Sequence, residues 1–198
     1  AGKLNFNIDL KNIDIYKDYH FDEIFKFDKK FLLIHLDEKW FQKYYYKDFT
    51  DINPNKNELD ILIKNILSTL NGSHDIIITT GSKELDIINQ YVSDFKQFKK
   101  NFNIKEINNN SITVIKSLSF KDLEFIVKNS SFLICCEGGV SHVSNGFKVK
   151  TLAFFEKNRI QHTKYWTGHM ENLVLYERKD MKKIIYDEQF YKIIKENL

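Results

Sequence analysis

The stretch Phe132-Leu-Ile-Cys-Cys-Glu-Gly-Gly-Val-Ser-His-Val-Ser-Asn-Gly146 has three parts: an apolar run, a glycine turn and a segment with helical spacing. Its apolar beginning, residues 132–136, predicts a strand buried on both faces. The strand ends at a carboxylate, and two glycines then break the chain. Apolar residues at helical spacing follow at once: Val140, Val143 and Phe147. The order of strand, glycine turn and helix is typical of parallel α/β sheets.

Five further apolar runs predict strands in the rest of the chain, at residues 31–36, 75–80, 111–115, 151–155 and 172–176. Each is an unbroken run without alternation, and amphipathic segments separate the runs. With right-handed crossovers, this pattern predicts an α/β fold. We expect a doubly wound, Rossmann-like parallel sheet of about six strands over residues 30–198.

Several helices should connect these strands. The longest is expected from about Asn57 to Leu70, where Asn71-Gly72 ends it. Other helices are expected at residues 40–46, from a Ser82 N-cap to about residue 95, after a Ser119 N-cap, and at residues 179–196. Residues 1–29 do not fit the alternation, and we interpret them as a lead-in segment with a candidate strand at residues 6–10.

The composition argues against several classes of partner. The net charge is only +3, and Arg159 and Arg178 are the only arginines. A protein that reads nucleic acid would be expected to use more arginine, so no nucleic-acid partner is expected. Cys135 and Cys136 are adjacent on one strand, point to opposite faces and should not pair, which suggests a reducing compartment. No segment resembles a membrane span or a signal peptide, so we expect a cytoplasmic protein.

The glycine turn after residue 136 is a candidate anion site. A helix N-terminus aims backbone N–H groups at its ligand, and glycines let phosphate approach. The candidate donors are Gly138, Gly139, Val140 and Ser141, while Glu137 can accept hydrogen bonds from sugar or ribose hydroxyls. His142 lies within reach of the same ligand, although a structural hydrogen bond is the commoner role there. A plain turn capped by Ser141 explains this segment about equally well on its own.

Loops after the other strands meet at the same edge of the sheet. Lys39 can neutralise a diphosphate, although a solvated lysine beside a core Trp40 is the commoner case. Thr80 and Gly81 offer a hydroxyl and a free backbone, and Ser117 belongs to a loop that either holds a nucleobase or caps a helix. His162 and His169 lack partners at metal-ligand spacing, so no metal site is expected.

Residues 115–146 resemble the carboxyl-terminal half of the heptosyltransferases, glycosyltransferase family 9. In that family a strand ends in an acidic residue, and a small residue, a glycine, a variable pair and a histidine follow. Lys39-Trp40 matches a family pair, and residues 148–155 match the next strand. Four positions depart from the pattern: Glu137 replaces Asp, Gly138 replaces Ser or Thr, and Glu156-Lys157 replaces Gly-Pro. The resemblance covers residues 30–178.

This resemblance implies a single half of a GT-B enzyme that makes an inverting sugar transfer. The donor would be a nucleotide-diphosphate sugar, bound without a metal or other cofactor. Lys39 would meet the diphosphate, the glycine turn would offer N–H groups, and Glu137 would hold sugar hydroxyls. The glycan or glycolipid acceptor and the general base would belong to an amino-terminal domain outside these 198 residues. A lipopolysaccharide precursor as acceptor would bring the protein to the inner face of the membrane.

Two other functions remain open from the sequence. One is a non-catalytic nucleotide-sugar binding module. The other is a GT-B-like nucleotide-sugar epimerase or hydrolase. That enzyme would need two acidic residues and a histidine in the cleft, of which the sequence offers Glu137 and His142.

Overall fold

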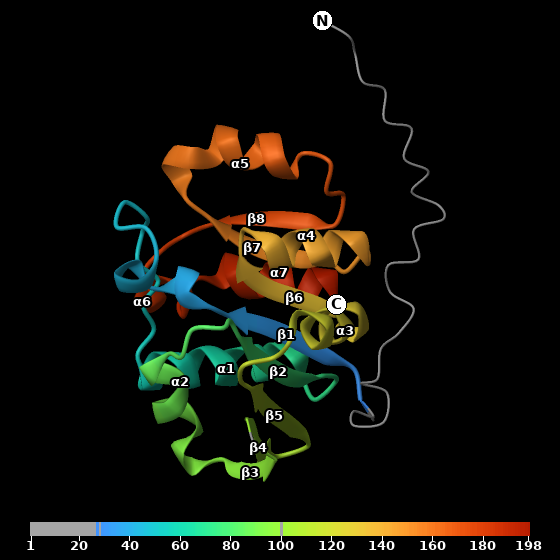
Figure 1. Ribbon diagram of the computed structural model, residues 1–198. Coiled ribbons are helices and arrows are strands. Elements are labelled where there is room, and N and C mark those ends of the chain that lie inside the picture. Colours follow the sequence, from blue (N-terminus) through green and yellow to red (C-terminus); the bar gives the residue numbers. More distant parts are fainter. Residues whose placement is uncertain (1–26, 28, 100) are drawn as a thin grey trace, which may run out of the picture.

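The computed structural model describes residue 27, residues 29–99 and residues 101–198 (Figure 1). Most of the predicted lead-in, including the candidate strand at residues 6–10, lies outside the described residues. Eight strands form one sheet in the order β3-β4-β5-β2-β1-β6-β7-β8. Their bounds are β1 (Phe31–Leu36), β2 (Asp75–Thr80), β3 (Lys96–Lys99), β4 (Phe102–Ile107), β5 (Asn110–Ile115), β6 (Phe132–Cys136), β7 (Thr151–Phe155) and β8 (Leu173–Glu177).

The six strands expected from the apolar runs are all present, and each pairs in parallel with its neighbours of that set. The expected strand count was nevertheless too low. A hairpin of β3 and β4 adds two antiparallel strands beside β5. Its residues mix charged and apolar side chains, and most of β4 is only partly buried. An edge strand needs no continuous apolar run, and this pattern therefore gives no buried-strand signal.

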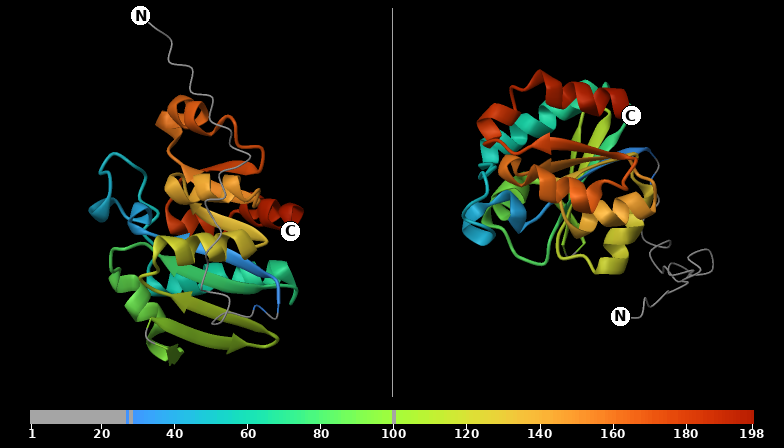
Figure 2. Two further views of the ribbon diagram at one scale, coloured as in Figure 1. Left: turned by 45° about the vertical axis from the view of Figure 1, so that its right-hand side comes forward. Right: turned by 90° about the horizontal axis from the view of Figure 1, so that it is seen from above.

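Helices cover both faces of the sheet (Figure 2). The helices are α1 (Lys56–Leu70), α2 (Asp86–Tyr91), α3 (Phe120–Asn129), α4 (Gly139–Gly146), α5 (Ile160–Thr167), α6 (Met181–Ile184) and α7 (Glu188–Asn197). One core cluster joins α1, α2, α6 and α7 to one face of the strands. A second cluster joins α3 and α4 to the opposite face. The central strands are therefore buried on both sides, as their unbroken apolar runs predicted.

Side chains alternate between these two clusters along each strand. In β1, Leu32 and Ile34 belong to the first cluster and Leu33 to the second. Cys136 and Cys135 divide in the same way, and both are buried free thiols. The expectation that they point to opposite faces and do not pair is confirmed.

The helix predictions were less accurate than the strand predictions. The ends of α1 are confirmed, with Asn71 in the left-handed conformation, and Ser119 caps α3. The Ser82 N-cap was wrong, because α2 begins at Asp86 without a side-chain cap. Residues 38–44 form two 3-10 turns in place of the expected helix, the final helix is split into α6 and α7, and α5 was not predicted. In the described part of the chain, no helix has the length and apolar character needed to cross a membrane.

Candidate functional site

The chain leaves the centre of the sheet in two directions. From β1 it proceeds to β2 and β5, and from β6 it proceeds to β7 and β8 on the other side. The neighbours β1 and β6 therefore flank a topological switch point, where ligands bind beyond the carboxyl ends of the strands. The loop from Asp37 and the turn from Glu137 both start at this point.

Lys39 and Gly138 meet directly at the switch point. A methyl group added to Gly138 would overlap Lys39 Nζ. Gly138 also has a φ of 153°, a backbone conformation that residues with a side chain rarely adopt. The glycine therefore serves two purposes: it allows the turn between β6 and α4, and it leaves the space that the Lys39 ammonium occupies.

The first turn of α4 presents free backbone donors. The Ser141 hydroxyl accepts from Gly138 N at 3.2 Å and donates to Gly138 O at 2.7 Å, so the N–H of Gly138 is already used. Within the described residues, the N–H groups of Gly139, Val140 and Ser141 have no hydrogen-bond partner. Ser141 therefore caps the turn, and three of the four predicted donors, at Gly139, Val140 and Ser141, have free N–H groups at the helix N-terminus.

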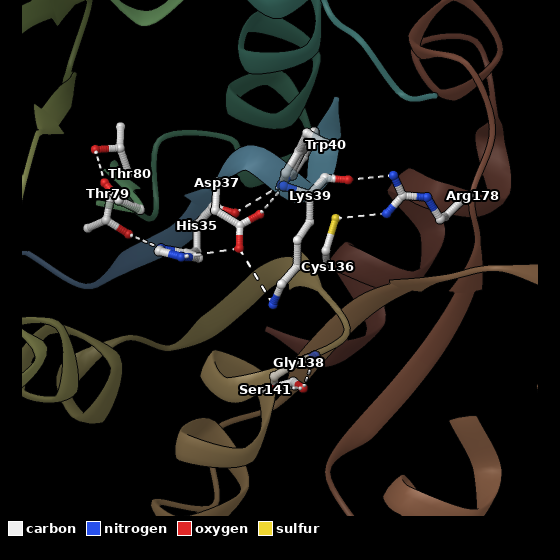
Figure 3. Close-up of polar contacts among 11 residues, drawn as sticks. His35, Asp37, Lys39, Trp40, Thr79, Thr80, Cys136, Gly138, Ser141 and Arg178 are labelled. Carbon is white, nitrogen blue, oxygen red and sulfur yellow. Dashed lines mark hydrogen bonds and ion pairs between the residues drawn. The ribbon is translucent and has the colours of Figure 1, made fainter. Parts of the chain in front are cut away.

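A buried polar chain leads to Lys39 from inside the sheet (Figure 3). Thr79 Oγ1 lies 3.0 Å from His35 Nδ1, and His35 Nε2 lies 3.7 Å from Asp37 Oδ2. The same Asp37 oxygen lies 3.7 Å from Lys39 Nζ, and the other carboxylate oxygen accepts from Lys39 N at 3.1 Å. Asp37 thereby contacts both the backbone N–H and the side-chain ammonium of Lys39. Trp40 is fully buried and donates to His35 O at 3.0 Å, which confirms its predicted anchoring of this turn in the core.

Burial shifts the protonation of this chain. Burial raises the pKa of Asp37 to about 6, although Lys39 opposes the shift. Burial and the Lys39 charge lower the pKa of His35 to about 4. For Lys39, burial is the largest influence and lowers the pKa, but the attractions to Asp37, Cys136, Tyr45 and Cys135 together outweigh it, so the pKa is raised. The ammonium at Gly138 therefore stays charged at neutral pH, while His35 is neutral.

Arg178 ties the loop after β1 to the end of β8. Its buried guanidinium donates to Thr50 O at 2.9 Å, to Lys39 O at 2.5 Å and to Cys136 Sγ at 3.2 Å. Burial raises the pKa of the Cys136 thiol to about 12, so a neutral thiol meets the cation. Glu156 holds the same loop from β7, because its carboxylate accepts from Thr50 N at 2.6 Å and Thr50 Oγ1 at 3.3 Å.

These groups surround a pocket of about 200 Å³ at the ends of β6, β7 and β8. Cationic, acidic and aromatic side chains line it, among them Lys39, Arg159, Arg178, Glu137, Glu156, His162, Tyr45, Tyr46 and Phe49. Typical ligand pockets enclose about 300–1,000 Å³. The volume of this pocket lies below that range.

Two of the predicted residues lie in a different place. Thr80 and Ser117 line a second pocket of about 160 Å³, beyond the ends of β2 and β5. Ser117 N donates to Thr80 Oγ1 at 3.4 Å, and Ser117 has a φ of 55°. Gly81 lies between this pocket and the switch point, since a methyl group there would approach Glu38 Oε2 to 2.9 Å. The predicted residues at this edge of the sheet thus line two separate pockets.

His142 is exposed and does not line the first pocket. Its ring lies 6.1 Å from that of His169. Sequence reasoning missed Asp37, His35, Glu156 and Arg178. Asp37 could have been found, because it follows a buried strand in the same way as Glu137. Arg178 carried a weaker signal, as one of two arginines in the chain.

No family model and no curated protein matches the sequence. Solved structures do resemble the fold. UDP-GlcNAc 2-epimerase of Methanocaldococcus jannaschii, in complex with UDP-GlcNAc and UDP, aligns over 94% of this chain and 44% of its own, with 15% identity and a TM-score of 0.52. Escherichia coli heptosyltransferase WaaC with ADP aligns over 90% of this chain and 48% of its own, with 11% identity and a TM-score of 0.52.

At these identities the likeness shows the fold alone. The chain has a Rossmann-like fold of the kind found in GT-B enzymes, and it spans less than half the length of either protein.

Proposed function

We propose that this chain is the donor-binding half of an inverting glycosyltransferase that resembles the heptosyltransferases. The observation that carries the proposal is the position of Lys39 Nζ directly over Gly138, at the N-terminus of α4. A charged ammonium, three free N–H groups and a helix dipole converge on one place at the switch point. That combination suits the diphosphate of a nucleotide sugar.

The same groups would assist the departure of the nucleotide diphosphate. Negative charge develops on the leaving diphosphate as the bond to the sugar breaks, and fixed donors stabilise charge without reorganising. Lys39 is held in place by Asp37 and by the Arg178 contact to its carbonyl. Glu137 follows β6 beside the pocket and would accept hydrogen bonds from sugar hydroxyls. The acceptor hydroxyl and the base that deprotonates it would belong to the other half of the enzyme.

The pocket with Thr80 and Ser117 would receive the nucleobase. It lies on the far side of the switch point from the pocket with Glu137, and polar groups line it. The proposed ligand would therefore span the sheet edge, with its base near β2 and β5 and its sugar near β6 and β7.

One observation supports a second function, a nucleotide-sugar epimerase or hydrolase. Such chemistry needs two carboxylates and a histidine, and Glu137, Glu156 and His162 line a common pocket. Glu156, however, accepts two hydrogen bonds from Thr50 and so supports the loop. Incubation with UDP-GlcNAc, followed by proton NMR, separates the two functions: a new sugar configuration or free sugar would indicate the second one.

Calorimetry with UDP, ADP, GDP and CDP tests the proposal. At least one should bind, and Gly138→Ala should abolish or greatly weaken binding, because the methyl group displaces the Lys39 ammonium and strains the turn. Gly146→Ala is the matched control, since a methyl group there meets nothing within 4 Å. No binding by any of the four at millimolar concentration would refute the proposal.

A further inference from the structure

The chain places both of its arginines in one pocket. Arg159 and Arg178 are the only arginines among 30 basic residues, and both line the pocket that contains Lys39 and Glu137. Arginine presents a planar fork of donors, which lysine lacks. All the other basic residues of this chain are lysines. The position of both arginines in this pocket therefore suggests that the planar set of donors of a guanidinium has a role there.

Arg178 uses its fork within the fold. The guanidinium is buried and donates to two carbonyls and to the Cys136 sulfur. Its role is to hold the loop after β1 against β6 and β8.

Arg159 is exposed, whereas Arg178 is buried. Its guanidinium carbon lies 4.9 Å from the centre of the Phe49 ring and 5.6 Å from that of Tyr46. Within the part of the chain that the structure describes, the guanidinium makes no hydrogen bond and no ion pair. Glu156 lines the same pocket, but Thr50 engages both of its oxygens. The aromatic rings thus support the face of the guanidinium and leave its N–H edge unused, which suits bidentate binding of an oxyanion.

The diphosphate would not occupy this fork. Lys39 follows β1, the glycine turn follows β6, and Arg159 follows β7, and these three strands are consecutive in the sheet. Strands two places apart are about 10 Å from each other. The proposed diphosphate lies at the β1–β6 end, and Arg159 starts from the β7 end of the same pocket, toward which the sugar is proposed to extend.

We propose that Arg159 determines specificity for a sugar that carries an oxyanion, such as the carboxylate of a uronic acid. This inference rests on the proposed function and names the substrate class of that site. Tyr46 and Phe49 would keep the guanidinium flat and pointed into the pocket. A neutral sugar would leave the fork unpaired and would bind more weakly.

Ligand-observed NMR with glucuronic acid 1-phosphate and glucose 1-phosphate tests the inference without depending on the nucleobase. The matched galactose pair repeats the comparison. The wild-type protein should bind each acidic sugar about tenfold more tightly than its neutral counterpart, the ratio expected for one charge-assisted pair. Arg159→Gln should abolish that preference, and Arg159→Lys should restore only part of it. Lys157→Gln, a change at an exposed neighbour that contacts Glu177, should leave the preference intact.

The outcomes separate this inference from the proposed function. Equal affinity for acidic and neutral sugars, no binding of either, or a preference that survives in Arg159→Gln would overturn the inference, while nucleotide binding by calorimetry would still stand. Failure of every nucleoside diphosphate to bind would refute the proposed function whatever the sugar result.

Discussion

Lys39 is the residue on which the proposed site depends most. Its ammonium is charged, partly buried and held over the glycine turn, so removing it takes away the main positive charge near the diphosphate. Lys39→Ala should weaken binding of a nucleoside diphosphate by about 1–3 kcal/mol, the loss expected for a charge-assisted contact. Calorimetry measures this change directly.

Lys43→Ala is a suitable control for Lys39→Ala, because Lys43 belongs to the same loop but contacts the Tyr44 ring. The Lys43→Ala variant should bind a nucleoside diphosphate as tightly as the wild-type protein does. If Lys39→Ala binds as tightly as the control, Lys39 has no role in binding.

The contributions of His35 and Asp37 to the free energy of unfolding should depend on pH in opposite directions. The pKa of Asp37 rises from 3.8 to about 6 on folding, so this carboxyl stays protonated to a higher pH in the folded state than in the unfolded state. Its contribution to the free energy of unfolding therefore falls as the pH rises from about 4 to 6. The pKa of His35 falls from 6.5 to about 4, so its contribution rises over much the same interval. In the wild-type protein the two contributions largely cancel.

Asp37→Asn should therefore gain stability relative to the wild type as the pH rises from about 4 to 6, by roughly 1–3 kcal/mol. His35→Gln should lose stability relative to the wild type over the same range. Urea denaturation at several pH values gives both differences. A constant difference for Asp37→Asn across this range would show that Asp37 titrates normally in the folded protein.

Strands were easier to predict than helices, for a physical reason. Five of the six parallel strands, β1, β2, β5, β6 and β7, are largely buried on both faces, so each leaves an unbroken apolar run in the sequence. The edge strand β8 is only partly buried but carries an apolar run as well. The β3–β4 hairpin lies at the sheet edge and leaves no such run. Residues 179–196 keep helical spacing, yet the chain breaks there because Asp187 accepts hydrogen bonds from Lys179 and Tyr176 and caps α7.

In the candidate site, too, local sequence motifs could be predicted and long-range contacts could not. Glu137 to Ser141 form a local motif, and the sequence therefore revealed it. Arg178 acts through contacts such as that with the carbonyl of Lys39, 139 positions away, which no local pattern reports.

Arg178 joins β8 to the loop after β1, and its loss should loosen that loop. Arg178→Met removes three hydrogen bonds, one of them to the buried sulfur of Cys136. We expect the free energy of unfolding to fall by roughly 2–4 kcal/mol. Thermal denaturation should show the loss, whereas Lys182→Met, at an exposed position of α6, should stay within about 0.5 kcal/mol of the wild type. An equally stable Arg178→Met would mean that the loop is held by other contacts.

At the scale of the whole described chain, the two pockets of the proposed site lie at the same edge of the sheet. Each of these two pockets is smaller than a typical ligand pocket. The fold of the chain matches less than half of each enzyme that it resembles. Under the proposed function, the acceptor would be bound outside the described residues.

Amide chemical-shift mapping tests the central claim most directly. Isotope-labelled protein is titrated with whichever nucleoside diphosphate binds in calorimetry, and with the matching nucleoside as a control. We predict the largest shifts at the N–H groups of Gly139, Val140 and Ser141, with further changes at Lys39. The nucleoside should shift only the region around Ser117. Absence of any shift at residues 139–141, or shifts confined to another part of the molecule, would contradict the assignment of the switch point as a diphosphate site.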